Sequence, residues 1–595
     1  MAKKTALFGG RTVKVENRSG FDKSFLNMFT TGVGTITPVV RKLLIPSSGR
    51  CKIPTHVELP PLAANAYLRS HWKMEAFFCP LRLCYGGFQS WFSGEPVYDI
   101  DNGQYSRAKL PYGVIPSTLV SADGTAPSLT IDSSELKRCF GAQSLSDYFN
   151  LRFQSVNDRP QIPIDDGTSA QIDLYNVNGV RVNLFPYLAY HLIIDHYYRN
   201  KSVSKPAFTP PLADHSSSPG TSTEHIASYL PFESHPRRIS VILGSNMDLS
   251  DGTTIADNLS AAFADQTSTD FLNNGRELCM LVQRNYGDDY FTAARPNAQD
   301  GNPVVVQTDQ NGRFTIAALR VQNSFQEFSE NQNYATPDFI QTNKARYGVS
   351  LSEGIAQKPI LLGSADFPIY TKSVELNTNV SNSDGAGNTR NPFALNGILG
   401  SKAGSVSGNG VFSFDFDVKE PGYLMVFATL VPEANYAFGL SKEMRIFTED
   451  GSLVDLPCSL LEHVGDEPIF QEELVPTRLK NVFGYVQRYL WHKAGSDGNQ
   501  IHGLFRSGES LQAFAPQRYF GGAQQISSSF LAIRKSDLDD VAAVDSGISD
   551  FGVMADCAVE LFISEPLSES ALPALVNPAS EHGRSVYLKN AGSKF

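Results

Sequence analysis

The sequence is poor in charged residues and has no long apolar run. Only 19% of its 595 residues are Asp, Glu, Lys or Arg, whereas an average globular protein has roughly 25%. A surface poor in charge is typical of a subunit covered by neighbours, but Ser, Asn, Gln and Thr would explain it equally well. No stretch approaches the length of about 18 apolar residues that spans a membrane. The basic start also lacks the apolar core of a secretory signal, so we expect no membrane insertion.

The cysteines form no recognisable pattern. Seven are present, at positions 51, 79, 84, 139, 279, 458 and 557. Their number is odd, and Cys79 and Cys84 are five residues apart rather than in a CxxC motif. This pattern favours unpaired thiols in a reducing cytosol.

Common catalytic and cofactor signatures are missing as well. The sequence contains no GxxxxGK[ST], GxGxxG or GxSxG motif and no zinc-ligand spacing. His191 and His196 diverge by about 140° around a helix, so we interpret them as packed or capped side chains. The adjacent acids at 165–166, 288–289 and 539–540 are interpreted as surface turns, because neighbouring strand residues point to opposite faces. We predict no enzyme activity, no cofactor and no metal site.

Strand patterns dominate what is present. Residues 411–418 (VFSFDFDV) alternate between apolar and polar side chains, as a half-buried antiparallel strand does. Residues 423–431 (YLMVFATLV) are almost wholly apolar and predict a strand buried on both faces, with turn residues at 420–422 between the two. Further strands at 72–79 and 557–565 each end at a proline.

Helical patterns are few. Residues 184–198 predict a short aromatic-rich helix with Pro186 in its first turn. A second helix is expected over 314–330, with one apolar stripe formed by Ala318, Val321, Phe325 and Phe328. Many strands with few helices predict an all-β sandwich rather than a βαβ fold.

Positive charge is concentrated at the N-terminus of an acidic chain. The net charge is −11, but residues 1–50 hold nine Lys and Arg against two acids, interleaved with phenylalanines. Cations neutralise phosphates and aromatic rings stack on unpaired bases, so the segment suits single-stranded nucleic acid. An arm that docks on a neighbouring subunit explains the pattern equally well. The candidate residues for either contact are Lys3, Lys4, Arg11, Lys14, Arg18 and Lys23.

The chain predicts one large domain after a short arm. We expect a basic N-terminal arm at residues 1–50 and a single domain at 51–595. Polar stretches at about 100–135, 201–280 and 376–410 are rich in Gly, Ser, Asn or Pro. None of them separates two complete hydrophobic patterns, so we interpret them as long loop insertions on one core.

Several segments together resemble the major capsid proteins of microviruses (Microviridae), of the gokushovirus and alpavirus type. The segments lie at 17–53, 64–94, 181–200, 284–301, 314–328, 346–349, 358–369, 422–439, 482–493 and 501–514. Examples are Asp-Tyr-Phe-Thr at 289–292, Thr-Ile-x-x-Leu-Arg at 315–320 and Phe-Gly-Tyr-x-x-Arg-Tyr at 483–489. Each is weak alone, but together they keep the family's order from about residue 17 to residue 520.

The resemblance implies an eight-stranded antiparallel jelly roll of the viral capsid type, with long loop insertions and a few short helices. It implies a structural protein that self-assembles into a T=1 icosahedral shell around a circular single-stranded DNA bacteriophage genome. The implied partners are other copies of the chain, the DNA, other phage structural proteins and a host cell-surface receptor such as a glycan. Such a protein is made in the host bacterial cytoplasm and ends in the virion.

One departure from the family concerns the outer surface. Gokushovirus-like members carry a long insertion before the Thr-Ile-x-x-Leu-Arg helix, whereas here only residues 302–313 occupy that place. We therefore expect any exterior protrusion to come from 201–280. The alternative, from another class, is a carbohydrate-binding or carbohydrate-active β-sandwich. The missing signal peptide and the presence of only three tryptophans weigh against it.

Overall fold

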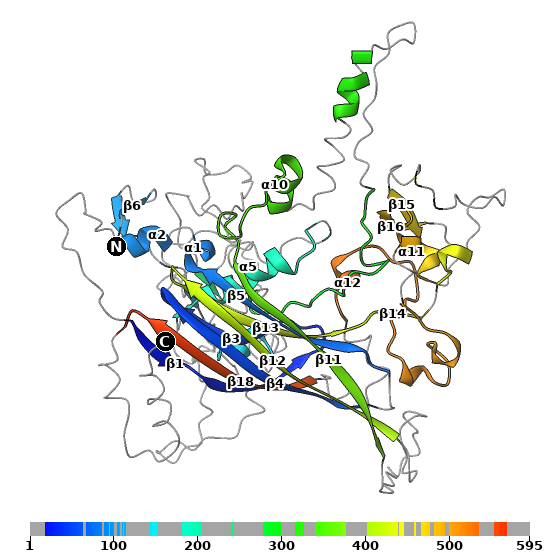
Figure 1. Ribbon diagram of the computed structural model, residues 1–595, viewed down its shortest axis with the longest axis horizontal. Helices are drawn as coiled ribbons and strands as arrows, with labels where there is room; N and C mark the ends of the chain where they lie inside the picture. The colour runs from blue at the N-terminus through cyan, green and yellow to red at the C-terminus, as the bar shows by residue number, and fades with distance from the viewer. Residues whose placement is uncertain are drawn as a thin grey trace, which may run out of the picture.

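The structure of the chain is a computed structural model (Figure 1). It describes residues 18–62, 67–85, 88–94, 96–99, 104–107, 112–114, 143–150, 181–201, 240–242, 278–298, 316–325, 339–375, 402–444, 466–475, 481–493, 499–534 and 552–567, without Ala318 and Phe438 and with a few isolated positions besides.

The main sheet contains nine strands, and every pair in it is antiparallel. One half runs in the order β2 (Phe25–Gly32), β18 (Gly552–Glu565), β4 (Ser47–Leu62) and β12 (Lys402–Val418). β1 (Ser19–Asp22) pairs with the last residues of β18, beyond the part that pairs with β2.

The other half runs in the order β11 (Ile360–Glu375), β5 (Ser70–Pro80), β13 (Gly422–Pro432) and β3 (Thr37–Leu44). β11 connects the two halves, because it pairs with β5 through 360–369 and with β12 through 370–375. The long strands cross the molecule as stacked ribbons in Figure 1. The prediction of an all-β protein with few short helices is confirmed.

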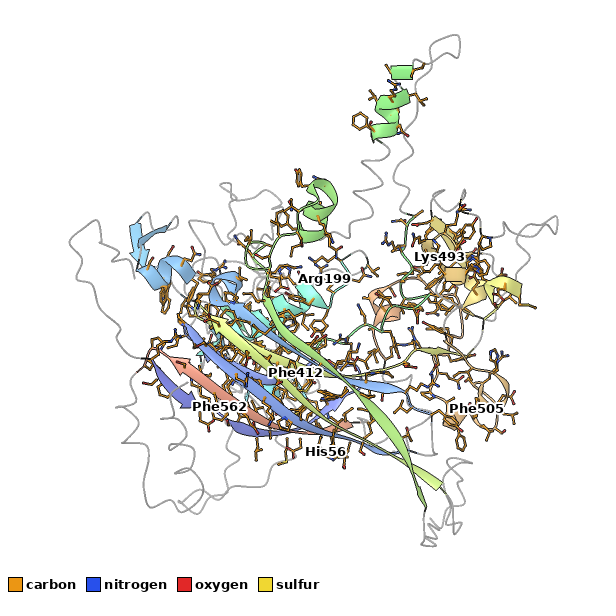
Figure 2. All side chains as sticks on the ribbon, viewed as in Figure 1. His56, Arg199, Phe412, Lys493, Phe505 and Phe562 are labelled. Atoms are coloured by element: carbon orange, nitrogen blue, oxygen red, sulfur yellow. The ribbon has the colours of Figure 1, made fainter. Side chains whose placement is uncertain are left out.

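The alternation predicted for 411–418 is present in β12. Phe412, Phe414 and Phe416 are buried, while Ser413 and Asp415 between them are exposed. The three rings pack on one another along the strand, with neighbouring centroids 5.1 and 6.4 Å apart. This face belongs to the largest hydrophobic cluster, and Figure 2 labels Phe412 as one of its members. A period of two thus sorts the side chains between core and solvent.

Strand β13 is buried at every position, as its unbroken apolar run predicts. Leu424 and Val426 point into the largest cluster, whereas Met425 and Phe427 belong to a second cluster on the opposite face. Helix α5 (Phe185–Tyr197) supplies much of that second cluster, and proline stands in its first turn. The predicted helix is therefore confirmed, and it covers Met425 and Phe427 on the outer side of β13.

At the end of the turn between β12 and β13, position 422 has no room for a side chain. A Cβ atom on Gly422 would lie 2.5 Å from Cζ of Phe78 and 2.6 Å from the carbonyl oxygen of Cys79. Both neighbours belong to β5, which pairs with β13 at this point. Only a residue without a side chain lets the two strands approach so closely.

A third hydrophobic cluster lies at one end of the sheet. Its aromatic centre is formed by Tyr290, Phe291, Phe483 and Phe530. The hairpin of β15 (Asp466–Phe470) and β16 (Val482–Gln487) packs there, and the parallel bridge of β14 (Asn435–Tyr436) with β17 (Asn499–Gln500) follows directly after β13.

The remaining elements are short. The helices are α1 (Leu81–Cys84), α2 (Phe88–Ser93), α4 (Leu145–Tyr148), α10 (Phe339–Tyr347), α11 (Leu490–Lys493) and α12 (Ser528–Leu531). The other strands are β6 (Pro96–Asp99), β7 (Gln104–Arg107), β8 (Tyr112–Val114), β9 (Arg181–Asn183) and β10 (Ser240–Ile242). Single 3-10 turns are η2 (Lys442–Met444), η3 (Gln471–Glu473), η4 (Gly503–Phe505) and η5 (Gln512–Phe514).

The described part of the predicted N-terminal arm consists largely of strands. Residues 19–22, 25–32 and 37–44 form β1, β2 and β3, and β4 begins at Ser47. The predicted insertions lie mostly outside the described residues, although β12 already begins at Lys402, inside the stretch predicted as a loop. The division into arm and domain otherwise stays a prediction.

The helix predicted over 314–330 is present at residues 316–317 and 319–325. Of its predicted stripe, Val321 and Phe325 are 52% and 59% exposed. Ala318 and Phe328 lie outside the described residues.

Five of the seven cysteines lie in the described ranges, and all five are buried free thiols. The Sγ atoms of Cys79 and Cys84 are 3.6 Å apart, too far for a covalent bond. The expectation of unpaired thiols is confirmed for these five. Among the described helices, none is long and apolar enough to cross a membrane.

Candidate functional site

The structure describes two of the six cations proposed to contact nucleic acid or a neighbouring subunit. Arg18 donates from Nη2 to the carbonyl oxygens of Pro46 and Ser564, at 3.0 and 3.3 Å. Lys23 forms an ion pair with Glu565, with 2.7 Å between Nζ and Oε1. Both residues therefore attach the first strand to the end of β18. The other four, Lys3, Lys4, Arg11 and Lys14, lie outside the described residues.

The outer face of β4, β12 and β18 carries cations that are already paired with acids on neighbouring strands. Arg50 contacts Asp415 at 2.7 Å, and Lys52 contacts Glu560 at 3.5 Å. These side chains are about half exposed or more, so salt weakens the pairs. Opposite charges on this face leave no stripe of uncompensated positive charge to follow a phosphate backbone.

A groove of about 670 Å³ opens beside this face, between β2, β4, β18 and the segment 143–150. Three carboxylates line it, those of Glu58, Asp147 and Asp556. His56 also lines it, and hydrogen bonds to Asn409 and Glu58 raise the pKa of its imidazole. Three carboxylates beside one imidazole repel phosphate, so the groove does not suit nucleic acid.

His191 is a core residue rather than a metal ligand. It lies on α5, fully inside the second cluster, and its Nε2 donates to the carbonyl oxygen of Leu278 at 2.9 Å. Burial lowers the pKa of His191 to about 4, so the ring is neutral at pH 7. In the described ranges, no three His, Cys, Asp or Glu side chains are grouped as metal ligands would be.

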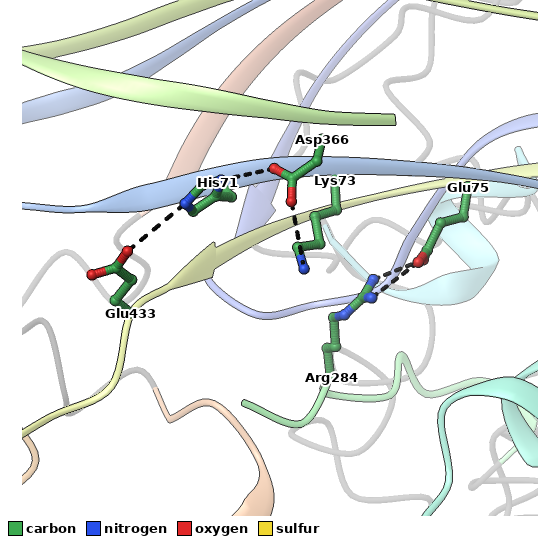
Figure 3. A network of polar contacts seen from close by, with 6 residues as sticks. All are labelled: His71, Lys73, Glu75, Arg284, Asp366 and Glu433. Atoms are coloured by element: carbon green, nitrogen blue, oxygen red, sulfur yellow. Dashed lines mark hydrogen bonds and ion pairs between the residues drawn. The ribbon is translucent and has the colours of Figure 1, made fainter. Parts of the chain in front are cut away.

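A network of charged side chains extends from β5 to the neighbouring strands (Figure 3). At its inner end Glu75 and Arg284 form a fork with two hydrogen bonds of 2.7 and 3.0 Å, and both side chains are less than one-fifth exposed. Tyr198 donates its hydroxyl to Glu75 and lies under the guanidinium, 5.1 Å from its ring centroid to Cζ of Arg284. Burial, together with Glu75, raises the pKa of Tyr198.

The outer end of the network is more exposed. His71 lies between Asp366, at 2.8 Å, and Glu433, at 3.9 Å, and Lys73 reaches the same aspartate at 3.6 Å. Alternate residues of β5 thus carry the charges, so the network follows one face of a single strand. Its acidic partners, Asp366 on β11 and Glu433 after β13, are supplied by the two neighbours of β5, so these contacts hold adjacent strands of the sheet together.

Similarity to known proteins extends over most of the chain rather than over a single site. The family described as "Capsid protein (F protein)" matches residues 172–567. This chain belongs to the F capsid protein family. The match includes α5 and the strands β11, β12, β13 and β18, and it ends two residues after the last strand.

A phage capsid protein is similar to part of this chain at low sequence identity. "Capsid protein VP1" of Chlamydia phage 1 is 23% identical over 216 residues, which is 34% of this chain and 33% of that protein. The aligned part thus spans about a third of the relative's length.

Arg518, within the range that the family matches, is a buried charged residue that the sequence patterns did not identify. It is 2% exposed, and its Cζ lies 4.5 Å from the ring centroid of Tyr286 and 4.6 Å from that of Phe530. Its guanidinium also donates to the carbonyl oxygen of Phe530. An arginine enclosed by aromatic rings stabilises the third cluster through cation–π contacts, and so it serves the F capsid fold rather than a ligand.

Asp289, the first residue of the Asp-Tyr-Phe-Thr segment, is connected to this arginine through Tyr436. Its Oδ1 accepts from the backbone amides of Phe291 and Thr292, both at 2.8 Å, and its Oδ2 accepts from the hydroxyl of Tyr436 at 2.7 Å. That hydroxyl lies 3.4 Å from Nη1 of Arg518. The acid interpreted as a surface turn therefore holds a loop of the third cluster in place.

Proposed function

We propose that this chain is the major capsid protein of a microvirus, which self-assembles into a T=1 icosahedral shell around a circular single-stranded DNA phage genome. The observation that carries the proposal is the order of the strands, together with membership of the F capsid protein family. The role is structural, and the protein's place is the virion, after synthesis in the host bacterial cytoplasm.

The strand order supports an eight-stranded jelly roll. The main strands in chain order are β2, β3, β4, β5, β11, β12, β13 and β18. β2, β4, β12 and β18 belong to one half of the sheet, and β3, β5, β11 and β13 to the other. Consecutive strands therefore switch halves at every step except β5 to β11, which is the arrangement of two Greek keys in viral jelly rolls. The large intervals between strands, such as that between β5 and β11, are where we place the loop insertions of a single domain.

The charge distribution supports DNA contact by the residues before β1. Arg50 and Lys52 on the outer face of β4 are paired with acids of β12 and β18, and Arg18 and Lys23 contact the end of β18. Uncompensated positive charge is what neutralises a packaged phosphate chain. We therefore assign the DNA contact to Lys3, Lys4, Arg11 and Lys14, with the genome's remaining charge balanced by other phage structural proteins or small cations.

Expression of the full chain in bacteria, followed by electron microscopy and sedimentation, tests the proposal. We expect discrete shells of uniform diameter, and nuclease-protected single-stranded DNA in particles from infected cells. A soluble monomer with affinity for glycans, and no shells under any condition that assembles related capsids, would favour a carbohydrate-binding β-sandwich instead. Binding of intact shells to host cells then tests the receptor, including a glycan.

A further inference from the structure

Exposed apolar side chains are concentrated in one part of this chain. In the described ranges, eight of the 22 large hydrophobic residues that are strongly exposed lie between residues 316 and 355. They are Ile316, Leu319, Val321, Phe325, Phe339, Tyr347, Val349 and Ile355. Single exposed apolar residues need no explanation, but a concentration of this kind marks an interaction surface.

Four of the eight belong to one helix, formed by residues 316–317 and 319–325, which we call the projecting helix. Figure 1 draws it in green at the top, apart from the sheets and from α10. Every described residue of this helix except Gln322 is exposed. A helix with this many apolar side chains is stable when something covers it.

The apolar side chains lie on two opposite sides of the projecting helix. At about 100° per residue, Ile316 and Leu319 point within about 60° of each other, and Val321 and Phe325 within about 40°. The two pairs are separated by about 170° around the axis. A helix of a solvent-facing monomer has one apolar stripe, whereas apolar residues on opposite sides indicate cover from both sides.

The chemistry of the helix excludes a nucleic acid as that cover. Arg320 is its only charged residue, and one cation is too few to follow a phosphate backbone. The two apolar pairs resemble each other instead, since each contains aliphatic or aromatic side chains without a charge. One pair is therefore a suitable partner for the other pair on a second copy of the same helix.

The area also fits contact between copies. Side chains of this size expose roughly 150–200 Å² each when free, so eight that are about half exposed or more offer roughly 800 Å². A stable interface buries about 800 Å² on each partner. The four side chains of the projecting helix supply about half of this area, and the exposed residues that follow it in the chain supply the rest.

We propose that the projecting helix packs between two neighbouring copies of this chain, with Ile316 and Leu319 of one copy against Val321 and Phe325 of the next. This inference rests on the proposed shell and specifies one of its contacts. Two different faces meet in such a contact, so it repeats head-to-tail and closes a ring of three or more subunits around a rotation axis. A twofold contact would use the same face of both helices.

Cross-linking in assembled particles tests the arrangement. The double variant Ile316→Cys with Val321→Cys, treated with a short bis-maleimide, should give covalent trimers or larger rings on a denaturing gel. Each single variant should stay monomeric, because neither face meets itself. Dimers from either single variant would overturn the ring and indicate a twofold contact. Absence of cross-links from all three variants in well-formed particles would overturn the helix contact itself.

Charge insertion provides a second, independent test. Val321→Asp with Phe325→Asp should lower the particle yield at least tenfold and leave the thermal midpoint of the unassembled subunit unchanged. Gln322→Asp with Ser324→Asp adds the same charge to the flanks of the helix and should leave the yield close to that of the unaltered chain. Equal yields from the two variants would contradict the proposal. Failure of the unaltered chain to form particles would instead contradict the proposed function.

Discussion

Glu75 and His191 are both largely shielded from solvent, and each is accommodated differently. The carboxylate of Glu75 accepts two hydrogen bonds from Arg284 and a third from the hydroxyl of Tyr198. His191 donates to the backbone carbonyl oxygen of Leu278 and meets the ring of Tyr190 edge-on, and burial lowers its pKa to about 4. Burial of a charge is tolerated when a partner compensates it, and otherwise the group becomes neutral.

Removal of one partner of the inner pair should destabilise the subunit. Arg284→Met leaves the carboxylate of Glu75 facing an apolar side chain, and breaking a buried pair in this way costs about 3 kcal/mol. Urea unfolding of the unassembled subunit measures the loss. Arg50→Met is the matched control, because Arg50 and Asp415 are both more than 60% exposed and their pair adds little. Equal unfolding midpoints for the two variants would show that the inner pair stabilises the subunit no more than the exposed pair does.

The stability of the subunit should depend on pH through His191. Its pKa is about 4 in the folded chain and about 6.5 when unfolded, so the unfolded state binds the proton first as the pH falls. The contribution of the neutral ring is complete above pH 6.5 and is lost between about pH 6.5 and 4. It amounts to about 3 kcal/mol. Unfolding midpoints at pH 7 and pH 5 should differ less for His191→Gln than for the unaltered chain, and an identical difference would refute the assignment.

At the scale of the element, β18 shows how one strand is shared between core and surface. Val553, Cys557 and Leu561 are buried, whereas Met554 on the opposite face is 43% exposed. The strand lies between β4 on one side and β1 with β2 on the other. Its buried face therefore supports most of this half of the sheet.

Truncation of a buried side chain in β18 should be far more costly than truncation of an exposed one. Leu561→Ala leaves a cavity in the largest cluster and should lower the unfolding free energy by about 2–5 kcal/mol. Met554→Ala, in the same strand, should stay within about 1 kcal/mol of the unaltered chain. Both values come from chemical unfolding of the unassembled subunit. A similar loss in both variants would mean that the two faces are equally covered.

Local patterns predicted individual elements well, because period and burial are written into short stretches. The alternation before Val418, the unbroken apolar run of β13 and the proline at the start of α5 each identified an element within a few residues. Pairing between strands has no such local signal. Glu75 and Arg284 are 209 residues apart, and the rings that enclose Arg518 include that of the distant Tyr286 as well as that of Phe520 nearby. The basic pattern at the N-terminus likewise gave no sign that β1, β2 and β3 begin within it.

At the scale of the whole molecule, the two ends of the described chain meet in the same sheet. Residues 19–22 pair with the end of β18, and Lys23 holds Glu565, which is 2% exposed. The segment expected to contact DNA is therefore divided at about residue 18. The cations before it are the ones we propose to contact the genome, whereas Arg18 and Lys23 contact the end of β18.

Two deletions separate these roles. Removal of residues 2–17 should leave the subunit's thermal midpoint and shell formation intact, but lower the DNA content of particles, because Lys3, Lys4, Arg11 and Lys14 are lost. Removal of residues 2–23 also eliminates β1 and the partner of Glu565, so it should lower the midpoint by several degrees. Calorimetry and the ratio of absorbance at 260 and 280 nm measure the two effects. Normal DNA content after the shorter deletion would place the DNA contact elsewhere.

The pairing of β2 with β18 also decides when this protein can fold. Phe25 lies opposite Val559, so the ribosome must add more than 500 residues between the two partners. At roughly 5–20 residues per second, synthesis of that interval takes about 25–100 s. During this time the edges of β2 and β4 have no strand between them, which exposes backbone groups to other nascent chains. Completion of the sheet must therefore follow synthesis of β18, which ends at Glu565. A product that stops before β18 leaves β2 and β4 without the strand that joins them, so the topology distinguishes truncated chains from chains that reach this strand.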